Sequence, residues 1–418
     1  MIKKNKILFI SHSSYFNGAE ICLLTLLKTL NRDVFEPVVV FPNSGPLEEE
    51  IRLLNLKIYI TPLERWIRYK SDRPIFNSDI KNRVQGIINI IEKESVYIVH
   101  TNTSVVPEGA IAAKIKNIPH IWHIHEYLKG HTSFYPSLPL PLIYGCICAL
   151  SEKIVSVSEF VKGQFEPIIN TNKITTIYNG VAENKQTNNN NLLRKTYGIR
   201  DNEIIGVTLG ILTKEKGYNN FLESARIVRD QGYQVKFIWV GDGDKKTIRD
   251  FKLKVKKFGL KNSVIYLGFR KDIQEILKCS DFLMCTSIME TLSLAILEAM
   301  AAGIPVITTN CGGPSECVTE GITGFIVPIN DPIKLSEKII EISSDIELRK
   351  TLGENSLKCF QDKFIANNFT ERFEDLYLKI INDKNFETIS LKEKILLESF
   401  LQLYEGISEQ HWKTIKKI

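Results

Sequence analysis

The sequence predicts an α/β protein in which two doubly wound, Rossmann-like domains face a central cleft. Short apolar runs alternate with helical segments along both halves of the chain, as in parallel sheets covered by helices. A polar, asparagine-rich stretch at residues 182–191 separates the halves and is typical of an exposed linker. The 418 residues are enough for two separate cores. We therefore expect domains at residues 1–180 and 181–364, with C-terminal helices in 365–418.

The overall composition is that of an ordinary globular protein, with 44% hydrophobic and 24% charged residues. The net charge of +6 is small and scattered, so we expect no nucleic-acid partner, although weak attraction to an anionic membrane is compatible with it. The eight cysteines show neither metal-binding nor disulfide spacing, which indicates a reduced, cytoplasmic protein. The apolar run near the N-terminus is too short for a signal peptide, and no run is long enough to span a membrane.

The first half starts with a strand, a glycine-containing loop and a helix, which is the plan of a phosphate-facing turn. The strand is expected at residues 6–10 and the helix at 19–30. Gly18, between them, permits close backbone approach of a ligand or a positive φ. Further elements are expected as strands 38–41, 58–60, 97–100, 119–125 and 174–177 and helices 48–54, 82–92 and 107–116.

Two segments interrupt this alternation. Residues 65–74 are basic and aromatic, and they predict either a solvated loop or a contact for an anionic acceptor or membrane headgroups. Residues 128–142 are rich in proline, aromatic and small residues, and they predict a loop beside the cleft or an apolar lip that touches lipid.

The histidines are concentrated in the first half, where five of the seven fall between residues 100 and 131. In the strand at 119–125, side-chain alternation places His123 and His125 on one face. No helix-borne or Cys-His spacing supports a metal site, so no metal is expected. His120 and His123 fit satisfied core imidazoles.

The second half repeats the alternation around a central segment at residues 281–328. Its strands are expected at 204–209, 236–240, 264–267, 282–285 and 304–308 and its helices at 218–230, 272–279, 292–302, 332–343, 346–360 and 364–381.

Two carboxylates frame the helix expected at 292–302. Glu298 lies inside the helix, whereas Glu290 lies in the preceding loop and can point across the helix N-terminus. The free N–H groups at this terminus offer a site for a diphosphate, and the carboxylates suit hydroxyl donors such as a ribose and a sugar. The N-cap is expected at Thr291 or Ser293, and the donors near Leu292, Ser293 and Leu294.

The pattern around this helix resembles the signature of retaining glycosyltransferases of family 4, which have the GT-B fold. The motifs that carry the resemblance are the pair Glu290 and Glu298, the run AGIPV at 302–306 and the run GGPSE at 312–316. A further Gly-Arg-x-x-x-x-Lys-Gly pattern is matched at Gly210, Lys216 and Gly217, but Ile211 stands where the arginine is usual. Lys214 is a candidate to replace that arginine, and nothing in the spacing proves it.

The resemblance implies a metal-independent transferase that uses a nucleotide-diphosphate sugar and no cofactor. It implies that Glu298 binds the ribose and that Glu290 binds the donor sugar. It also implies that the diphosphate is bound by Lys216, Gly210 and the backbone after Glu290. In the first half it implies that Gly18 closes over the phosphates and that His125 positions sugar and acceptor.

Amphipathic and aromatic segments in the first half suggest an acceptor that is a glycan or a lipid-linked molecule of cell-surface polysaccharide synthesis. We expect a cytoplasmic protein that can contact the inner face of the plasma membrane. The resemblance also implies that the helix at 364–381 crosses back to the first domain. Asp242 and Asp244 spell the D-x-D pattern of a different, metal-dependent class of glycosyltransferases. We discount that pattern, because Asp242 lies in a turn between strand and helix and Asp244 starts a charged helix, whose N-terminus favours acidic residues.

Three other functions stay open on the sequence alone. A sugar-nucleotide epimerase could use the same double fold, and Ile211 favours a sugar-nucleotide-binding subunit without catalysis. A nicotinamide dehydrogenase is disfavoured because no G-x-G-x-x-G follows the first strand. The amphipathic segment 387–418 predicts a helical hairpin, a dimer contact or a membrane-surface helix, without a choice among them.

Overall fold

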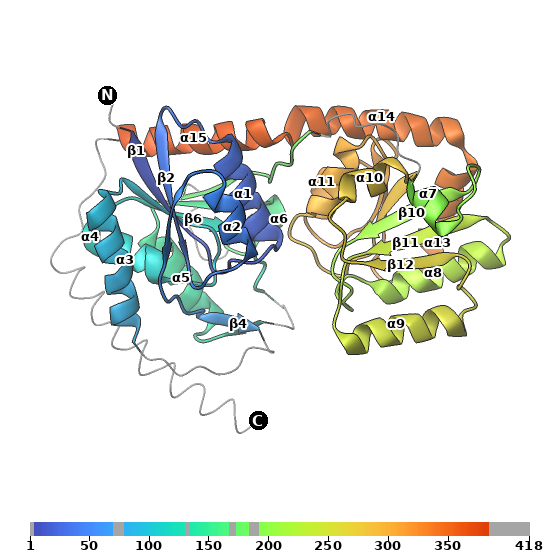
Figure 1. The fold of residues 1–418 in the computed structure, drawn as a ribbon, viewed down its shortest axis with the longest axis horizontal. Coiled ribbons are helices and arrows are strands. Elements are labelled where there is room, and N and C mark those ends of the chain that lie inside the picture. Colours follow the sequence, from blue (N-terminus) through green and yellow to red (C-terminus); the bar gives the residue numbers. More distant parts are fainter. Residues whose placement is uncertain (1–3, 70–78, 130–133, 167–172, 184–191, 384–418) are drawn as a thin grey trace, which may run out of the picture. The chain divides into compact units, whose positions relative to one another are not determined.

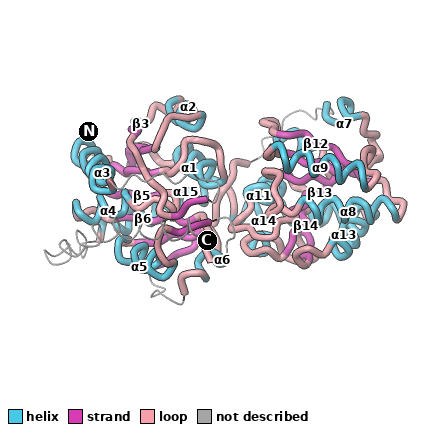
Figure 2. The backbone as a smooth tube through the Cα atoms, turned by 90° about the horizontal axis from the view of Figure 1, so that it is seen from below, coloured by secondary structure: helices cyan, strands magenta, loops and turns pink. Residues whose placement is uncertain are grey.

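The computed structural model describes residues 4–69, 79–129, 134–166, 173–183 and 192–383 (Figure 1). The chain divides into two compact units. Unit 1 comprises residues 1–178 and 367–418, and unit 2 comprises residues 179–366. Each unit contains one large parallel sheet with helices packed on it (Figure 2), so the predicted α/β class with two Rossmann-like domains is confirmed.

The sheet of unit 1 has the strand order β3-β2-β1-β5-β6-β8-β9, and all its strands are parallel. Its strands are β1 (Asn5–Ile10), β2 (Phe35–Phe41), β3 (Lys57–Ile60), β5 (Ile98–Thr101), β6 (His120–Ile124), β8 (Lys153–Ser156) and β9 (Ile174–Thr176). Its helices are α1 (Gly18–Thr29), α2 (Pro46–Arg52), α3 (Ile80–Glu94), α4 (Glu108–Lys116), α5 (Leu140–Leu150) and α6 (Glu159–Gly163).

The C-terminal helix α15 (Ala366–Asn382) packs into the core of unit 1 (Figure 1). Its Phe373 and Tyr377 are fully buried, and the Tyr377 ring lies edge-on to Phe9 of β1 and Phe35 of β2. The helical spacing of its apolar residues explains this, since it gives α15 one continuous apolar face.

The sheet of unit 2 has the strand order β12-β11-β10-β13-β14-β15, again all parallel. Its strands are β10 (Ile204–Leu209), β11 (Val235–Val240), β12 (Val264–Gly268), β13 (Phe282–Cys285), β14 (Val306–Thr309) and β15 (Gly324–Val327). Its helices are α7 (Leu192–Tyr197), α8 (Tyr218–Asp230), α9 (Lys245–Lys257), α10 (Ile273–Lys278), α11 (Leu294–Ala301), α12 (Pro314–Cys317), α13 (Pro332–Ser344) and α14 (Ile346–Lys363).

Each sheet has one point at which the strand order reverses, between β1 and β5 in unit 1 and between β10 and β13 in unit 2. At such a switch point the loops that leave the two central strands turn to opposite faces, which opens a crevice at the carboxyl ends of the strands. These two points are therefore where functional side chains are expected.

The expectation of loops at 65–74 and 128–142 is wrong for the parts that the structure describes. Trp66 is fully buried and stacks on Trp122 of β6, with ring centroids 5.7 Å apart. The next residues form β4 (Ile67–Tyr69), which pairs antiparallel with β7 (Phe134–Pro136). Strands of three residues are too short to give a periodic pattern, and the basic neighbours hide the buried tryptophan. Residues 70–74, 130–133 and 387–418 lie outside the described residues.

Candidate functional site

The switch point of unit 2 holds a lysine–glutamate ion pair. Lys216 lies in the loop after β10 and Glu290 in the loop after β13, and Lys216 Nζ is 2.6 Å from both carboxylate oxygens of Glu290. The Glu290 side chain is largely buried, whereas a third of the Lys216 side chain is exposed. An ammonium has three N–H groups, so one of them stays available for another acceptor.

Hydrogen bonds from three loops fix this pair in place. The Ser287 hydroxyl donates to Glu290 Oε2 at 2.8 Å, and the Thr286 hydroxyl donates to the carbonyl of Lys216 at 2.8 Å. The Glu290 N–H donates to the carbonyl of Cys311, in the loop after β14, at 3.0 Å. The two charges are therefore positioned by side chains and backbone and do not depend on each other alone.

Glycines let these loops approach one another closely. A Cβ on Gly313 would lie 1.8 Å from the carbonyl oxygen of Thr291, and a Cβ on Gly217, whose φ is +73°, would lie 1.8 Å from that of Thr286. Gly210 has a φ of +151°, a conformation that side chains rarely adopt. Gly313 of the GG motif and Gly217 of the Lys-Gly motif are thus required because a side chain at either position would collide with the backbone of a neighbouring loop.

The helix after Glu290 begins two residues later than its apolar pattern predicted. Ser293 is the N-cap and α11 starts at Leu294, so Thr291 is not the cap and Leu292 is not helical. Ser293 caps without a side-chain hydrogen bond, and its carbonyl accepts from the N–H groups of Ile296 and Leu297. The N–H groups at the start of this helix lie beside the ion pair, because Lys216, Ser287, Glu290, Ser293 and Ala295 line one small pocket.

Burial and charge act in opposite directions on the pKa of Lys216, whereas burial alone acts on that of Glu298. Burial alone would lower the pKa of Lys216, but the charge of Glu290 and its hydrogen bonds raise that pKa above its ordinary value. Glu298, inside α11, has no charged partner among the residues that the structure describes, and burial raises its pKa to about 7. Glu298 is therefore a carboxyl group that a hydroxyl or amide could satisfy, whereas Glu290 lies against the ammonium of Lys216.

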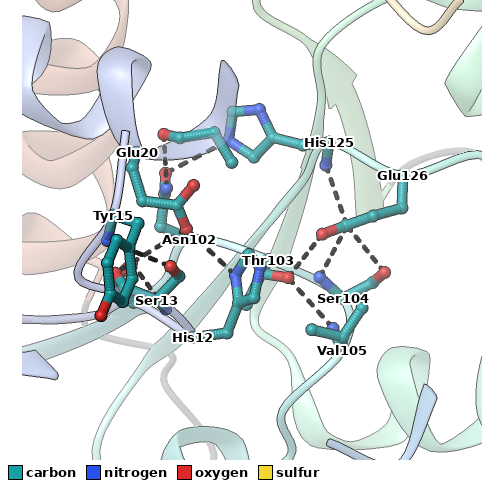
Figure 3. Close-up of polar contacts among 12 residues, drawn as sticks. His12, Ser13, Tyr15, Glu20, Asn102, Thr103, Ser104, Val105, His125 and Glu126 are labelled. Carbon is teal, nitrogen blue, oxygen red and sulfur yellow. Dashed lines mark hydrogen bonds and ion pairs between the residues drawn. The ribbon is translucent and has the colours of Figure 1, made fainter. Parts of the chain in front are cut away.

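The switch point of unit 1 gathers neutral polar groups (Figure 3). His125 directly follows β6, and its Nε2 lies 3.2 Å from Oδ1 of Asn102, which follows β5. The Asn102 amide nitrogen donates to the carbonyl of Ala19 at 2.9 Å, so the amide oxygen must face the imidazole and accept from it. Burial lowers the pKa of His125 to about 3, which keeps this imidazole neutral.

The carboxylate of Glu126 connects the two loops at this switch point. Glu126 accepts hydrogen bonds from the Thr103 hydroxyl at 2.5 Å and from the N–H and hydroxyl of Ser104 at 2.9 and 2.8 Å (Figure 3). These bonds tie the loop after β6 to the loop after β5 and so set the direction of His125.

The other histidines of the cluster are parts of the core. His100 is fully buried, and its Nδ1 lies 2.7 Å from the hydroxyl of Tyr377. The ring of His123 packs against Phe373, and its centroid is 4.1 Å from that of His125. His120 Nε2 lies 2.9 Å from the Thr101 hydroxyl. His131 lies outside the described residues, and within the described ranges no group of histidine, cysteine or carboxylate side chains could hold a metal ion.

Gly18 opens α1 and differs from the glycines of unit 2. Its φ is not positive, so that part of the expectation is wrong, and a Cβ added there would meet nothing within 4 Å. Neither backbone conformation nor packing within the described residues therefore requires a glycine at this position, and close approach of a ligand stays a prediction.

Several well-placed residues carried no sequence signal. Ser287 and Glu126 are common residue types outside any motif, and only their position after a central strand could have marked them. That position did mark the run HTNT at 100–103, which contains Asn102. Asp244 accepts hydrogen bonds from the N–H groups of Lys246 and Thr247 at the start of α9, so it lies at the helix start as predicted and caps the helix.

Every helix within the described ranges is too short or too polar to cross a bilayer.

Known proteins share both this sequence pattern and this fold. Residues 189–358 match the family described as glycosyl transferases group 1, and residues 16–185 match glycosyltransferase family 4. The capsular polysaccharide biosynthesis glycosyltransferase CapM of Staphylococcus aureus is 30% identical over 345 residues, which are 77% of this chain and 86% of CapM. The UDP-Gal:alpha-D-GlcNAc-diphosphoundecaprenol alpha-1,3-galactosyltransferase of Escherichia coli is 25% identical over 398 residues, which are 91% of this chain and 98% of that protein.

A crystal structure of Anabaena HepE in complex with UDP and glucose matches the fold with a TM-score of 0.77. The two proteins are 22% identical, and the match covers 90% of this chain and 100% of that chain.

Proposed function

The chain belongs to the group 1 glycosyltransferases of family 4, and we propose that it is a retaining, metal-independent enzyme that uses a nucleoside-diphosphate sugar. The acceptor in this proposal is a glycan or a lipid-linked saccharide of cell-surface polysaccharide synthesis. The names of the S. aureus and E. coli relatives and the UDP and glucose bound to HepE support this choice of donor, acceptor and pathway.

The observation that carries the proposal is the Lys216–Glu290 pair at the switch point of unit 2. A diphosphate that leaves without a metal ion needs a fixed positive charge, and Lys216 supplies one. The free N–H groups at the start of α11 add hydrogen-bond donors at the positive end of a helix dipole. In this assignment Glu290 also binds donor sugar hydroxyls, and Glu298 binds the ribose.

The proposed reaction is an attack from the face that the diphosphate leaves. The bond between the sugar's anomeric carbon and the phosphate oxygen breaks, and a bond from the acceptor oxygen to that carbon forms. The acceptor hydroxyl gives its proton to the departing phosphate oxygen. His125 positions sugar and acceptor, and Lys216 stabilises the charge that develops on the phosphate, an effect worth ~3 kcal/mol for one preorganised donor.

A comparison of Lys216→Ala and Glu290→Ala with the wild type tests these roles. Each substitution should lower turnover about a hundredfold or more, because each removes a group that acts on the developing charge or the sugar. The matched control is Lys236→Ala, since Lys236 forms a 3.3 Å ion pair with Glu203 elsewhere in unit 2. Turnover of either site variant within about threefold of wild type would contradict the assignment.

A screen of UDP-, GDP- and ADP-sugars identifies the donor. The sugar nucleotide that binds the folded protein should raise its thermal midpoint, by an amount that grows with the logarithm of the ligand concentration relative to Kd. The acceptor assay can then use that donor with a synthetic lipid that carries N-acetylglucosamine on a diphosphate. A protein whose midpoint is unchanged by every sugar nucleotide would contradict the proposal.

One observation favours a second candidate, a subunit that binds sugar nucleotides without transferring the sugar. Ile211 occupies the place of the family's arginine with 57% of its surface exposed, and Lys214 is also exposed. If Lys214 replaces the arginine, Lys214→Ala should lower turnover at least tenfold. Donor binding without transfer, hydrolysis or epimerisation would instead support the binding subunit.

The location belongs to the proposal as well. We place the protein in the cytoplasm, in peripheral contact with the anionic inner face of the plasma membrane, because its net charge is +6. Co-sedimentation with vesicles that contain an anionic lipid, weakened by salt, is the expected result; equal sedimentation with neutral vesicles would contradict it.

A further inference from the structure

The switch point of unit 1 contains a second imidazole that no motif marks. His12 lies in the loop after β1, and its Nδ1 is 3.3 Å from Oε1 of Glu20 in the first turn of α1 (Figure 3). This is the distance of an ion pair, without the alignment of a regular hydrogen bond. The arrangement repeats that of His125 and Asn102, where a side-chain oxygen also faces one ring nitrogen.

Glu20 is unusual for a residue at this place in a helix. A glutamate three positions after the N-cap commonly closes a capping box at the solvent-exposed helix end. Glu20 instead has no exposed surface, and its Oε2 is buried without a hydrogen-bond partner among the described residues. The Ser11 hydroxyl donates to Oε1 at 3.3 Å, and His12 faces the same oxygen. The Asn17 side chain and the backbone of Glu20 also act on this carboxyl. A buried carboxyl oxygen without a hydrogen-bond partner costs stability and calls for an explanation, which a ligand site would give.

The imidazole of His12 leaves one nitrogen for a ligand. Glu20 faces Nδ1, 10% of the side chain stays exposed, and no partner of Nε2 is found among the described residues. Burial lowers the pKa of His12 to about 3, so the ring is neutral and one nitrogen carries the proton. A carboxylate at Nδ1 holds that proton there and makes Nε2 a hydrogen-bond acceptor.

We infer that His12 is a second hydroxyl-binding imidazole of the acceptor site in unit 1, and that Glu20 is a positioning residue that sets which ring nitrogen carries the proton. The ligand class is a sugar, because its hydroxyl groups can donate to Nε2 without a charge on either side. This inference rests on the proposed function, since it assigns the acceptor to unit 1.

Protonation of Glu20 should change which ring nitrogen of His12 carries the proton, and so turn Nε2 from a hydrogen-bond acceptor into a donor. A protonated Glu20 donates to Nδ1, which leaves the proton of the imidazole on Nε2, whereas an ionised Glu20 accepts from Nδ1–H. Burial raises the pKa of Glu20 to about 7, so both states are reached near neutral pH. The other titratable or charged groups whose fields act on the pair are Arg65, His125, Glu126 and the Cys22 thiol.

The first arm of the test is ring nitrogen NMR of the full chain labelled with 15N-histidine. The His12 signals are assigned from their loss in His12→Ala. We expect the Nδ1–H form at pH 8.5 and a shift towards the Nε2–H form at pH 5.5, and we expect Glu20→Gln to abolish this pH dependence. One unchanged tautomer at both pH values in the wild type would overturn the role of Glu20. This arm needs neither donor nor acceptor.

The second arm is kinetic and uses the donor found by thermal shift with the synthetic lipid that carries N-acetylglucosamine. His12→Ala should raise the acceptor KM about tenfold, the effect of one lost hydrogen bond, and leave the donor KM within twofold. Glu20→Gln should raise the acceptor KM in the same direction. The control is Glu108→Gln, because Glu108 is equally buried and lies in the first turn of α4 but bonds Arg83 at 2.8 Å.

The outcomes separate the inference from the proposed function. Wild-type transfer with an unchanged acceptor KM in His12→Ala would overturn the inference alone. An equal rise in acceptor KM for Glu108→Gln would show a general loss of structure and would also overturn it. A wild type that binds no sugar nucleotide would contradict the proposed function, while the NMR arm would still decide whether Glu20 sets the tautomer of His12.

Discussion

The two units place their polar side chains at the same topological point and fill it with different chemistry. In unit 2 a carboxylate pairs with an ammonium, Glu290 with Lys216. In unit 1 carboxylates and amides face neutral imidazoles and hydroxyls, as Glu20 faces His12 and Asn102 faces His125. A fixed cation suits a diphosphate, and neutral rings suit sugar hydroxyls. The strand order thus fixes where the site lies in each unit, and the side chains in the loops after the central strands determine which ligand chemistry suits it.

Burial raises the pKa of a carboxyl group to about 7 in each unit: that of Glu20, which is fully buried, in unit 1 and that of Glu298, which is half-buried, in unit 2. In both cases burial is the largest cause of the shift. The two carboxyls therefore offer the same proton chemistry beside different neighbours, and this allows the units to be compared by matched substitutions.

The largest effect is expected from a methyl group in the packed loop of unit 2. Gly313→Ala would place a Cβ 1.8 Å from the Thr291 carbonyl oxygen, so the loops that hold Glu290 must separate. We expect the free energy of unfolding to fall by about 3 kcal/mol, as for overpacked sites. Guanidinium denaturation measures it, and a change below about 0.5 kcal/mol would show that these loops are not closely packed.

The next effect tests whether the imidazole of unit 1 acts on transfer and not on donor binding. His125→Ala removes the ring that Asn102 orients, and we expect transfer to fall about tenfold. UDP affinity, measured by calorimetry, should stay within twofold, because His125 is proposed to contact sugar and acceptor, whereas the Lys216–Glu290 pair of unit 2 is proposed to bind the diphosphate. A tenfold loss of UDP affinity would contradict the assignment of diphosphate binding to unit 2 and of sugar and acceptor positioning to His125 of unit 1.

A smaller effect is expected in the pH dependence of stability. The folded protein holds the proton of Glu298 more tightly than the unfolded chain, whose carboxyl titrates near 4.5. This contribution to stability is therefore fully present below about pH 4.5 and is lost as pH rises to about 7. Glu298→Gln should remove that decline.

Glu20→Gln should likewise remove a loss of stability that occurs as pH rises from about 4.5 to about 7, because burial also raises the pKa of this carboxyl. Denaturation curves of wild type and both variants at pH 4.5, 6 and 7.5 provide the comparison. A stability difference from wild type that stays constant across this range in either variant would contradict the raised pKa of that carboxyl.

The smallest effect is expected at the glycine of unit 1. Gly18→Ala adds a Cβ that meets nothing within 4 Å, at a position without positive φ. Stability should change by less than about 0.5 kcal/mol, whereas transfer should fall if a ligand's phosphates approach this backbone. Loss of stability here would show that Gly18 has the same packing role as Gly313.

The sequence predicted the fold well because its signals are long and periodic. Alternating apolar runs located the strands of both sheets, and the face of α15 was visible in the spacing of Phe369, Phe373 and Tyr377. The three-residue strands β4 and β7 were missed because they are too short for a period, and because β4 contains Arg68 and β7 contains Pro136. The start of α11 was placed two residues early because Leu292 continues the apolar pattern into the loop.

The site was predictable only where a motif marks it. Glu290 and Lys216 were identified 74 positions apart in the chain, and the structure brings their charged atoms to 2.6 Å. His12 and Glu20 gave no signal, because a histidine in a loop and a glutamate in a first turn are ordinary features. Their importance depends on burial and on a partner across the loop, which are properties of the folded chain.

Titration calorimetry of UDP, or of the nucleoside diphosphate whose sugar raises the thermal midpoint, tests the central claim most directly. The claim is that the Lys216–Glu290 pair of unit 2 binds the diphosphate. It predicts saturable binding to the wild type and to His125→Ala, and affinity at least tenfold weaker for Lys216→Ala. Equal affinity of Lys216→Ala and wild type would contradict it.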